Sequence, residues 1–511
     1  MPQWKGSGSI PPASSLPGPE IPLGLIARVE KMGGQSNKAE NAYGLELICS
    51  DLRTLRFGFI PENHSRKQVY EAINHFAFPA SNNLDFFAFA YSATFEIEGW
   101  SLYSHKNELA RVIAGGSEWR ISAVNEDYKL CDTYPSQFAV PAAVDDTALE
   151  NAAKFRTRNR LPALSWVHPG TRASITRCSQ PKVGPWRRNE QDEALIKAIQ
   201  GTNPRSQKLV IMDARPKVNA VANQAKGAGY ESAEVYENTE ILFMNIPNIH
   251  VIRDSHRRVR DLCYPRADDL HWHAKLEDTH WLEYNKLILQ SAVMVVDLVQ
   301  QGTSVMVHCS DGWDRTPQIT ALAMMLLDPF YRTVMGFATL IEKEWLGFSH
   351  KFAQRFGQGN RNHGDEQRAP IFSQFLDCVQ HLLTQFPTAF ELNETLLQFL
   401  GDEIYTCRFG TFLFNSEKER QELRAREKTR SAWSHVIANL RLFSNPLYVQ
   451  QDAVLSPVMN ARRMQLWPGN YLRWSPEMRK ADAAMARQWE LRNLVDSLQE
   501  QVTRLQGQEA K

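Results

Sequence analysis

Short apolar or β-prone runs, broken by polar and glycine positions, occupy the first folded part of the chain, residues 21–80. This pattern predicts three strands, at Leu23–Val29, Tyr43–Cys49 and Leu52–Phe59. A helix is expected to follow over about Ser65–Phe76, because Pro79 cannot continue it. The pattern therefore predicts a small β-rich module that a helix closes.

The pattern changes near Trp100, beyond which predicted strands alternate with predicted helices. Runs typical of buried strands lie at Lys208–Met212, Ile241–Ile246 and Thr303–Val307. Helices are expected at Leu282–Gln300, at about Pro317–Leu327, and within Phe337–Phe356 and Ile371–Leu400. This alternation predicts an α/β fold (α+β for the whole chain) whose central sheet is covered by helices on both faces.

The two ends of the chain differ from this middle. Residues 1–20 are rich in Pro, Gly and Ser and cannot bury a core, so a disordered leader is expected. Residues 481–507 are charged and helix-prone, with apolar positions spaced four and three apart: Leu491, Val495, Leu498, Val502 and Leu505. This spacing predicts a coiled-coil tail, and an amphipathic helix packed on its own domain fits it equally well. The predicted domains are 1–20, 21–80, 98–475 and 481–507.

Composition narrows the possible partners. The chain has 511 residues, 43% of them apolar, and 58 basic residues nearly balance 57 acidic ones. A formal net charge of +1 gives no overall attraction to nucleic acid or to an anionic membrane. We therefore expect no nucleic-acid partner, and any attraction to phosphate must be local.

Cysteine usage and hydropathy indicate the compartment. The seven cysteines include no CxxC pair, which argues against a zinc site or a thioredoxin-type centre, and we expect neither metal nor cofactor. The odd count favours a reducing, cytoplasmic compartment. No signal peptide is expected, and the apolar stretch Leu287–Val299 is too short to span a bilayer. Membrane contact should therefore be peripheral.

One cysteine stands in a pattern that carries chemistry. Cys309 is followed six residues later by Arg315, between the predicted strand Thr303–Val307 and a helix that opens at Thr316-Pro317. In a strand–loop–helix setting this spacing forms a phosphate cradle, because backbone N–H groups and the helix N-terminus point at an anion. The arginine can clamp two phosphate oxygens, and the same positive surroundings lower the cysteine pKa so that a thiolate nucleophile exists. The spacing alone is weak evidence, and the flanking strand and helix strengthen it.

The loop itself contains further candidates. A carboxylate is electrostatically unfavourable beside a phosphate, so the presence of Asp311 and Asp314 in the loop suggests a catalytic role. One of them can serve as general acid and then as general base, and the sequence leaves open which one does so. Thr316 can donate a hydrogen bond to the leaving thiolate. Gly312 suits a position that needs an unusual backbone angle or close approach to phosphate. Trp313 is expected mainly to pack.

The run His308–Thr316, HCSDGWDRT, resembles the active-site signature of the catalytically active myotubularin phosphatases. Other segments between about Ile26 and Trp474 also resemble that family: Cys131–Tyr134, Leu164–His168, Thr176–Pro181, Asp213–Tyr230, Pro247–Ile252, Thr279–Tyr284, Glu342–Arg355 and Phe386–Glu394.

The resemblance implies a phosphatase that removes the 3-phosphate of phosphatidylinositol 3-phosphate and 3,5-bisphosphate through a cysteinyl-phosphate, on endosomal or other endomembranes. It favours Asp314 over Asp311 as the general acid. The implied substrate contacts are the loop Ser310, Asp311, Gly312, Trp313, Asp314 and Arg315, together with Asn223, Asn248, Ile249, Lys351 and Arg355. Spacing independently places Lys351 and Arg355 on one helix face, as a second positive site for a headgroup.

The sequence departs from the family at two points. Family members usually begin with an intact lipid-binding module of the pleckstrin-homology, GRAM type, whereas this chain enters it near Leu23–Val29, so the expected module is partial. Some members carry Arg where this chain has Lys351, and lysine cannot form a bidentate fork. The preference between lipids with one and two headgroup phosphates therefore stays open.

Two alternatives to an active lipid phosphatase are considered. The first is a pseudophosphatase adaptor, which the predicted tail would suit, but inactive members typically lack the cysteine or the arginine that this chain keeps. The second is a protein tyrosine phosphatase, which shares the cradle but would use a separate Trp-Pro-Asp acid loop that is not found here. The tail also predicts a homodimer, or a heterodimer with a related phosphatase.

Overall fold

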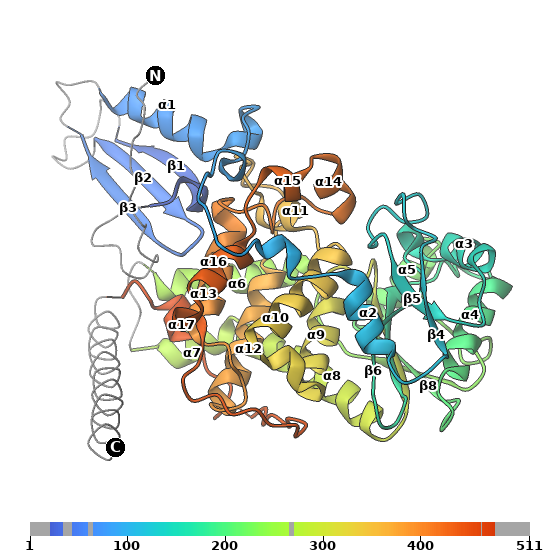
Figure 1. Cartoon of the computed structure of the whole chain (residues 1–511). Coiled ribbons are helices and arrows are strands. Elements are labelled where there is room, and N and C mark those ends of the chain that lie inside the picture. The colour runs from blue at the N-terminus through green and yellow to red at the C-terminus, as the bar shows by residue number, and fades with distance from the viewer. Residues whose placement is uncertain (1–20, 34–42, 60–64, 265–269, 461, 476–511) are drawn as a thin grey trace, which may run out of the picture.

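The computed structural model describes residues 21–33, 43–59, 65–264, 270–460 and 462–475. The predicted leader at 1–20 and the predicted coiled coil at 481–507 lie outside the described residues. Among the described parts, a β-rich N-terminal region precedes a large mixed α/β region (Figure 1).

The central sheet has five strands in the order β6-β7-β10-β8-β9. They are β6 (Ala163–Val167), β7 (Ser174–Ser179), β10 (Ser304–Cys309), β8 (Leu209–Asp213) and β9 (Thr239–Phe243). Strands β7, β10, β8 and β9 run parallel, and β6 is antiparallel to β7. Strand β10 lies in the middle with every residue buried, which places its carboxyl end among the ends of β7 and β8.

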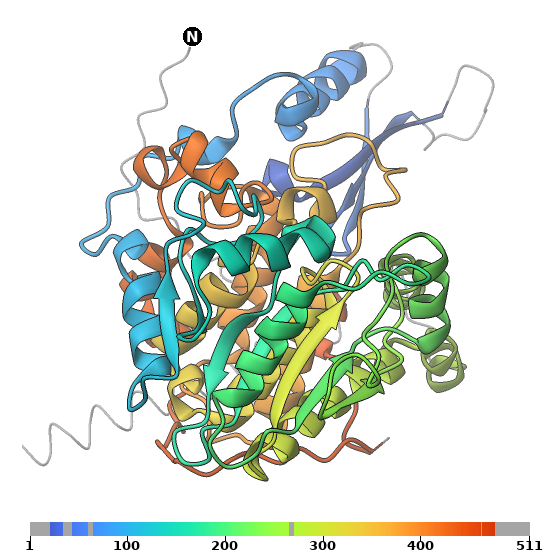
Figure 2. The same ribbon diagram turned by 90° about the vertical axis from the view of Figure 1, so that its right-hand side faces the viewer.

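Helices cover both faces of this sheet (Figures 1 and 2). The long helices α8 (Trp281–Gln300) and α9 (Arg315–Leu327) pack on one face, and α4 (Glu190–Gly201) lies on the other. The prediction of a helix-covered central sheet is therefore confirmed. Strands β8 and β10 begin and end within two residues of the strands predicted at 208–212 and 303–307. Strand β9 both begins and ends earlier in the sequence than the strand predicted at 241–246.

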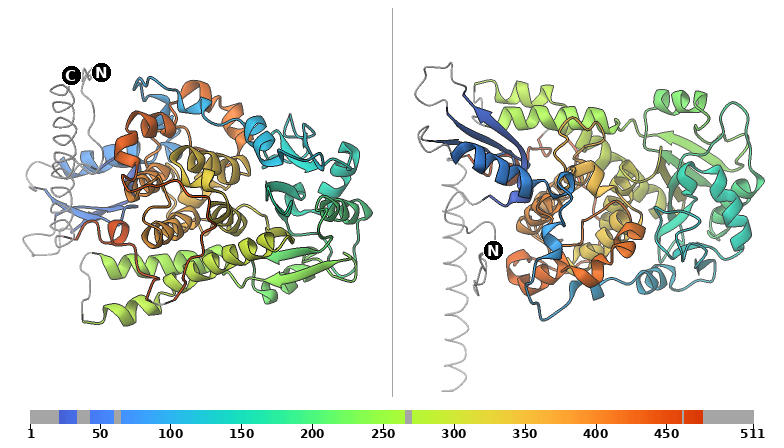
Figure 3. Two further views of the ribbon diagram at one scale, coloured as in Figure 1. Left: turned by 60° about the horizontal axis from the view of Figure 1, so that its bottom comes forward. Right: turned by 90° about the horizontal axis from the view of Figure 1, so that it is seen from above.

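The N-terminal region is a three-stranded antiparallel sheet with one helix. Strands β1 (Ile26–Met32), β2 (Gly44–Cys49) and β3 (Thr54–Gly58) are followed by α1 (Ser65–Ala77), close to the predicted elements. Its small core contains Ile26, Val29, Leu47, Ala77 and Phe78. This region lies at the opposite end of the molecule from the teal and green segment around α4 (Figures 1 and 3).

The last described residues hold this N-terminal region in place. The Trp474 indole Nε1 donates a hydrogen bond to the Asp51 carbonyl oxygen at 2.8 Å, and the Arg53 guanidinium lies 4.1 Å from the Trp474 ring centroid. Arg473 forms an ion pair with Asp402 of the large α/β region at 2.6 Å. The two ends of the described chain are thereby joined to each other and to the large region.

The remaining elements connect these parts: α2 (His105–Ile113), β4 (Trp119–Ser122), β5 (Phe138–Pro141), α3 (Asp146–Phe155), α5 (Lys217–Ala225), α6 (Ile249–Cys263), α7 (Trp272–Asp278), α10 (Val334–Leu340), α11 (Phe352–Phe356), α12 (Ile371–Gln385), α13 (Glu394–Thr406), α14 (Glu417–Glu422), α15 (Ala425–Lys428), α16 (Ala432–Ala438), α17 (Leu440–Phe443) and α18 (Pro468–Tyr471). Strands β4 and β5 form a separate antiparallel pair.

The segment 337–356 is less regular than its pattern indicates. Helix α10 continues as a π-helical turn over Ile341–Gly347, and α11 begins only at Phe352. The wide turn directs Lys343 to Glu108 at 2.9 Å and Glu344 to Arg177 at 2.8 Å, all within the interior. Such turns are frequent at functional sites, and this one precedes the residues that reach the Cys309 loop.

Candidate active site

Cys309 ends strand β10 and is 3% exposed, at the entrance to the loop that leads into α9. The Gly312 backbone N–H donates to the Cys309 Sγ at 3.2 Å. Gly312 has φ +76°, and a Cβ there would lie 2.3 Å from the Cys178 carbonyl oxygen, so only glycine fits. The loop is thus folded tightly around the sulfur.

Two buried arginines fix the loop from outside. The Gly312 carbonyl oxygen accepts hydrogen bonds from Arg177 Nη2 at 2.6 Å and from Arg160 Nη2 at 3.1 Å. Arg160 also donates to the Phe348 carbonyl at 2.8 Å. Because the two arginines hold the Gly312 carbonyl, the backbone of Gly312 is fixed and its own N–H stays directed at the Cys309 sulfur. An anion-binding loop requires N–H groups that are oriented in this way.

The electrostatic surroundings favour a thiolate. Burial is the largest influence and acts to raise the pKa of Cys309, but the Arg315 charge, the Thr316 hydroxyl and the Gly312 amide bring that pKa below its ordinary value. Among the described residues the Thr316 hydroxyl has no other hydrogen-bond partner. The sulfur can therefore act as a nucleophile and, later, as a stabilised leaving group.

Arg315 is the first residue of α9 and is 9% exposed. Its Nη1 donates to the Ile246 carbonyl at 3.2 Å, while its buried Nε has no partner in the described part of the chain. A phosphate seated on the loop would supply that acceptor, at the N-terminus of a helix that favours negative charge.

The two loop carboxyls have opposite environments. Asp314 faces Arg355, with its oxygens 2.8 and 3.1 Å from Nη2 and Nε, and His350 Nδ1 lies 3.1 Å away. Although burial opposes it, these partners hold the pKa of Asp314 well below its usual range. Burial and then the Asp314 charge raise the pKa of Asp311. Of the two, Asp311 is therefore the carboxyl more inclined to keep a proton.

The predicted second positive site differs in detail from its expected form. Lys351 is the residue before α11, so it does not share a helix face with Arg355. Both side chains nevertheless reach the loop, because the Lys351 ammonium lies 4.4 Å from the Trp313 ring centroid and Arg355 pairs with Asp314. Trp313 is 7% exposed, so it packs as expected and also carries a cation on its face.

The other predicted contacts are distributed around the loop. The Asn223 amide, on α5, donates to Gln180 Oε1 at 3.2 Å and reaches Ser310 Oγ at 3.5 Å. The Asn248 side chain instead accepts from two amides at the start of α6, where Ile249 is the first residue. Among the described contacts, neither Asn248 nor Ile249 has a hydrogen bond to the Cys309 loop.

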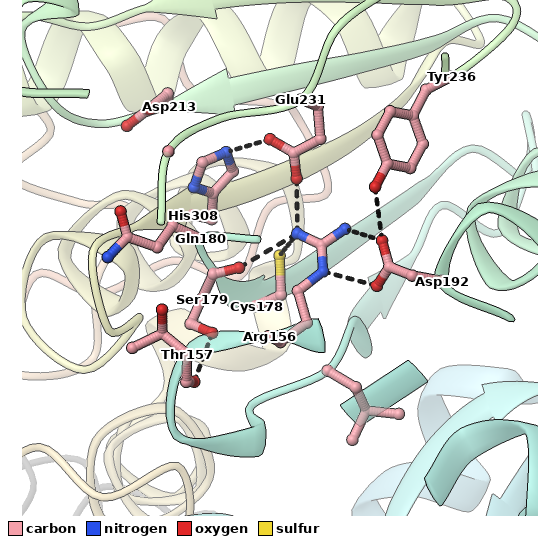
Figure 4. Close-up of polar contacts among 12 residues, drawn as sticks. Arg156, Thr157, Cys178, Ser179, Gln180, Asp192, Asp213, Glu231, Tyr236 and His308 are labelled. Carbon is pink, nitrogen blue, oxygen red and sulfur yellow. Dashed lines mark hydrogen bonds and ion pairs between the residues drawn. The ribbon is translucent and has the colours of Figure 1, made fainter. Parts of the chain in front are cut away.

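A buried charge network includes His308, the residue directly before Cys309 on β10 (Figure 4). His308 Nε2 lies 3.0 Å from Glu231, whose other oxygen accepts from Arg156 at 2.5 Å. Arg156 makes a bidentate pair with Asp192 at 2.7 Å, and the Tyr236 hydroxyl donates to that carboxylate. Since His308 Nδ1 faces the Cys309 carbonyl at 3.2 Å, both ring nitrogens meet acceptors, which suits the protonated ring.

We expect Glu231→Gln to destabilise the protein by roughly 3 kcal/mol, most strongly between about pH 5 and 6. Burial would lower the pKa of His308, but Glu231 raises it overall, while His308 and Arg156 lower the pKa of Glu231 against its burial. The pair is therefore complete above the unfolded Glu pKa, about 4.3, and below the unfolded His pKa, about 6.5. Its contribution declines as the pH rises through the raised pKa of His308. Urea unfolding of wild type and variant at pH 5.5 and 9 measures this.

Tyr236→Phe is the matched control, because it removes a hydrogen bond at the far end of the same network without touching His308. Its cost should be about 1 kcal/mol at both pH values. A Glu231→Gln penalty that is equal at pH 5.5 and 9 would contradict the assignment of a protonated His308.

Sequence reasoning did not select several of these residues. Arg177, Glu231 and His350 all lie far from Cys309 in the sequence, and none of them belongs to a distinct local motif. Arg160 lies between the recognised segments. The sequence did contain an indication of the role of Arg177. The other residues of its strand are apolar or small, so the arginine is expected to be buried, and a buried charge needs a partner.

Comparisons with known proteins agree with this geometry. A family model described as the myotubularin-like phosphatase domain matches residues 86–421. Myotubularin of Xenopus tropicalis is 49% identical over 463 residues, which cover 90% of this chain and 77% of that protein. Phosphatidylinositol-3,5-bisphosphate 3-phosphatase MTMR2 of Gallus gallus is 48% identical over 491 residues, 94% of this chain and 86% of that protein. The corresponding protein of Bos taurus is 50% identical over 472 residues, 92% and 73% of the two chains. The chain therefore belongs to the myotubularin family of phosphatases.

Proposed function

We propose that this chain removes the 3-phosphate of phosphatidylinositol 3-phosphate and phosphatidylinositol 3,5-bisphosphate. The observation that carries the proposal is the Cys309 sulfur, which has a lowered pKa and lies on a backbone cradle beside the unsatisfied Arg315 Nε. Relatives about half identical over nine-tenths of the chain bear the name phosphatidylinositol-3,5-bisphosphate 3-phosphatase. Lys351 and Arg355 add positive charge for a second anionic group of the headgroup.

In the proposed first step, the Cys309 thiolate attacks phosphorus. The P–S bond forms as the P–O bond to the inositol breaks, and the leaving oxygen takes a proton from a loop carboxyl. In the second step the resulting carboxylate removes a proton from water, which attacks phosphorus, releases the thiolate and gives inorganic phosphate. Thr316 and the Gly312 amide hydrogen-bond the departing sulfur.

We assign the proton transfer to Asp314 in the substrate complex, with Asp311 as a nearby, half-buried acid. Arg355 cannot clamp Asp314 and a headgroup phosphate with the same N–H groups. When a phosphate draws Arg355 away, burial and the added negative charge raise the pKa of Asp314. Substrate binding would thus convert a carboxylate into an acid.

Asp314→Asn should lower kcat on the lipid by about 10² to 10³-fold, because the inositol oxygen then leaves without a proton. An aryl phosphate whose leaving group needs no protonation should lose much less. Asp311→Asn should cost under about ten-fold on both substrates. Steady-state kinetics on the two substrates measure this, and the reverse ranking of the two variants would move the acid to Asp311.

We further propose that β1–β3 with α1 is a partial PH-GRAM-like module and that the chain works peripherally at the cytoplasmic side of an endomembrane such as the endosome. In the described ranges, no helix is long and apolar enough to cross a bilayer. Pairing through residues 481–507 is proposed from sequence alone, and the oligomeric state of the chain cut after Pro476 tests it.

A panel of phosphoinositides, each presented in vesicles, tests the proposed function through release of inorganic phosphate. We expect phosphate release from phosphatidylinositol 3-phosphate and from phosphatidylinositol 3,5-bisphosphate, and none from phosphatidylinositol 4-phosphate. Turnover of a phosphotyrosine peptide above that of the lipids would assign the site to protein substrates instead. Headgroup binding without any turnover would indicate an adaptor.

A further inference from the structure

A strained turn between α3 and β6 presents an arginine to solvent. The turn covers Thr157–Asn159, and the Arg158 side chain is exposed. Both Arg158 and Asn159 have positive φ angles, 56° and 58°. Residues with a side chain rarely adopt this left-handed conformation, which costs on the order of 1 kcal/mol or more for each of them. The fold therefore imposes an unfavourable backbone here, as it often does where a side chain must be placed for function.

Hydrogen bonds to two neighbouring segments fix the turn. The Thr157 N–H donates to the Gln180 carbonyl at 3.0 Å, and the Thr157 carbonyl accepts from Ser179 Oγ at 2.7 Å (Figure 4). On the other side, the Arg158 carbonyl accepts from Cys131 Sγ at 3.4 Å. All of these contacts use the backbone of the turn, so they leave the Arg158 guanidinium free.

The turn is also joined to the catalytic loop. Arg160, two residues after Arg158, donates to the Gly312 carbonyl at 3.1 Å. The Gln180 residue that holds the turn donates its own N–H to the Ser310 carbonyl at 3.2 Å. Both sides of the turn are therefore one contact away from the loop that surrounds Cys309.

The charge of Arg158 acts on the loop carboxyl Asp311. Burial and then the Asp314 charge raise the pKa of Asp311, whereas three arginines act to lower it: Arg160, Arg158 and Arg355. Arg160 is already engaged by backbone carbonyls, and Arg355 is paired with Asp314. Among the described contacts, the Arg158 side chain has neither a hydrogen bond nor an ion pair. It is the arginine of the three that is available to a ligand.

Arg158 and Lys351 also act on each other. Burial lowers the pKa of Lys351, and the Arg158 charge lowers it further, although Asp132 and Glu419 act to raise it. In the described part of the chain Lys351 forms no ion pair, and its ammonium lies on the Trp313 ring. Two cations without ion pairs repel each other at this side of the loop, and an anion within reach of both would remove that repulsion.

We propose that Arg158, together with Lys351, binds a second anionic group of the phosphoinositide headgroup while the Cys309 loop holds the 3-phosphate. The proposal rests on the proposed lipid phosphatase function and adds Arg158 to the residues that recognise the substrate. An ammonium is a point charge, whereas a guanidinium presents a planar fork to two oxygens. Arg158 supplies the bidentate contact that Lys351 cannot make. The ligand is an oxyanion of the headgroup, either a phosphate on the ring or the phosphodiester that joins the ring to glycerol.

Three soluble substrates test this contact. They are short-chain phosphatidylinositol 3,5-bisphosphate and phosphatidylinositol 3-phosphate, both below their micelle concentrations, and an aryl phosphate that has no second anionic group. Arg158→Gln should lower kcat/KM on the bisphosphate about ten-fold, mostly through KM, because it removes a charge-assisted contact to an oxyanion. The aryl phosphate should lose less than about two-fold, since it offers Arg158 nothing to bind.

The monophosphorylated lipid identifies the source of the anion. A loss much smaller than that on the bisphosphate assigns Arg158 to the ring 5-phosphate, and an equal loss on both lipids assigns it to the phosphodiester. Either result supports the proposal. A loss on the aryl phosphate as large as that on the lipids would show that Arg158 only shapes the loop. That result would overturn the proposal, as would unchanged kcat/KM on both lipids.

Two further variants complete the comparison. Arg158→Lys keeps the charge but not the planar fork, so it should recover only part of the loss. Arg441→Gln is the matched control, because Arg441 is an exposed arginine on α17 with no ion pair among the described residues, and α17 packs on α13 and α16. This control should change kcat/KM on the three substrates by less than about two-fold. A ten-fold loss in Arg441→Gln would mean that surface charge in general, and not Arg158, governs binding.

Binding of inositol 1,3,5-trisphosphate to the Cys309→Ser protein, measured by calorimetry, tests the contact without turnover. The affinity should fall about ten-fold when Arg158→Gln is added and stay within about two-fold when Arg441→Gln is added. If the wild-type chain hydrolyses no phosphoinositide while this difference persists, the proposed function fails and the anion site stands. If the lipids are hydrolysed and Arg158→Gln binds the trisphosphate as tightly as its parent, the assignment of Arg158 fails and the function stands.

Discussion

Cys309→Ser should abolish phosphate release from phosphatidylinositol 3-phosphate, with a loss on the order of 10⁴-fold or more in kcat. A serine hydroxyl stays protonated near neutral pH, and the charges that lower the pKa of Cys309 cannot bring an alcohol into the same range. The exchange of sulfur for oxygen hardly changes volume at a site that is 3% exposed. Release of inorganic phosphate from vesicles measures the effect.

The control is Cys378→Ser, a buried cysteine on α12 whose pKa burial raises well above its ordinary value. That variant should lose some stability and keep activity to within a few-fold. The Cys309→Ser protein should unfold at nearly the wild-type denaturant concentration. Undiminished release by folded Cys309→Ser protein would refute a cysteinyl-phosphate mechanism.

Arg315→Lys should reduce kcat/KM on the order of 10³-fold while preserving the charge. The planar guanidinium leaves its Nε free for phosphate while Nη1 is engaged by the Ile246 carbonyl, and an ammonium cannot keep both geometries. Loss of this charge-assisted clamp should weaken transition-state binding more than substrate binding, so kcat should fall more than KM rises. The acidic limb of the pH profile should move little, because lysine keeps the positive charge by which Arg315 lowers the pKa of Cys309.

Arg332→Lys provides the comparison. Arg332 is 1% exposed and donates to the backbone carbonyls of Met325 and Leu326, away from the Cys309 loop. The substitution should lower stability by about 1 to 3 kcal/mol and change kcat/KM by less than about three-fold. A loss in Arg315→Lys no larger than this would mean that the phosphate is held mainly by the backbone.

The elements around Cys309 follow closely from the pattern of the sequence. An apolar run at Thr303–Val307 can be satisfied only as a buried strand, and Pro317 fits only the first turn of the helix that follows. The glycine requirement at position 312 also follows from the local chain, since a tight loop needs a residue without a side chain. These features depend on neighbours in sequence, which is why a single chain reveals them.

Features that depend on distant partners could not be obtained in this way. The π-helical turn at Ile341–Gly347 exists because Lys343 and Glu344 find buried partners from other parts of the chain, and this interrupts the helix that periodicity favours. The same interruption sets Lys351 outside α11. The Arg355–Asp314 pair is equally invisible in sequence, because the two residues are 41 positions apart and no local pattern joins them.

The contact of Trp474 with Asp51 and Arg53 has a consequence for assembly. It ties the N-terminal sheet to the residues directly before position 476, so any molecule bound through the tail is tethered close to that sheet. The α5 segment, whose Asn223 contacts Ser310 of the Cys309 loop, lies at the opposite end of the molecule from that sheet (Figure 1). A partner held at the sheet would therefore leave the approach to the catalytic loop open.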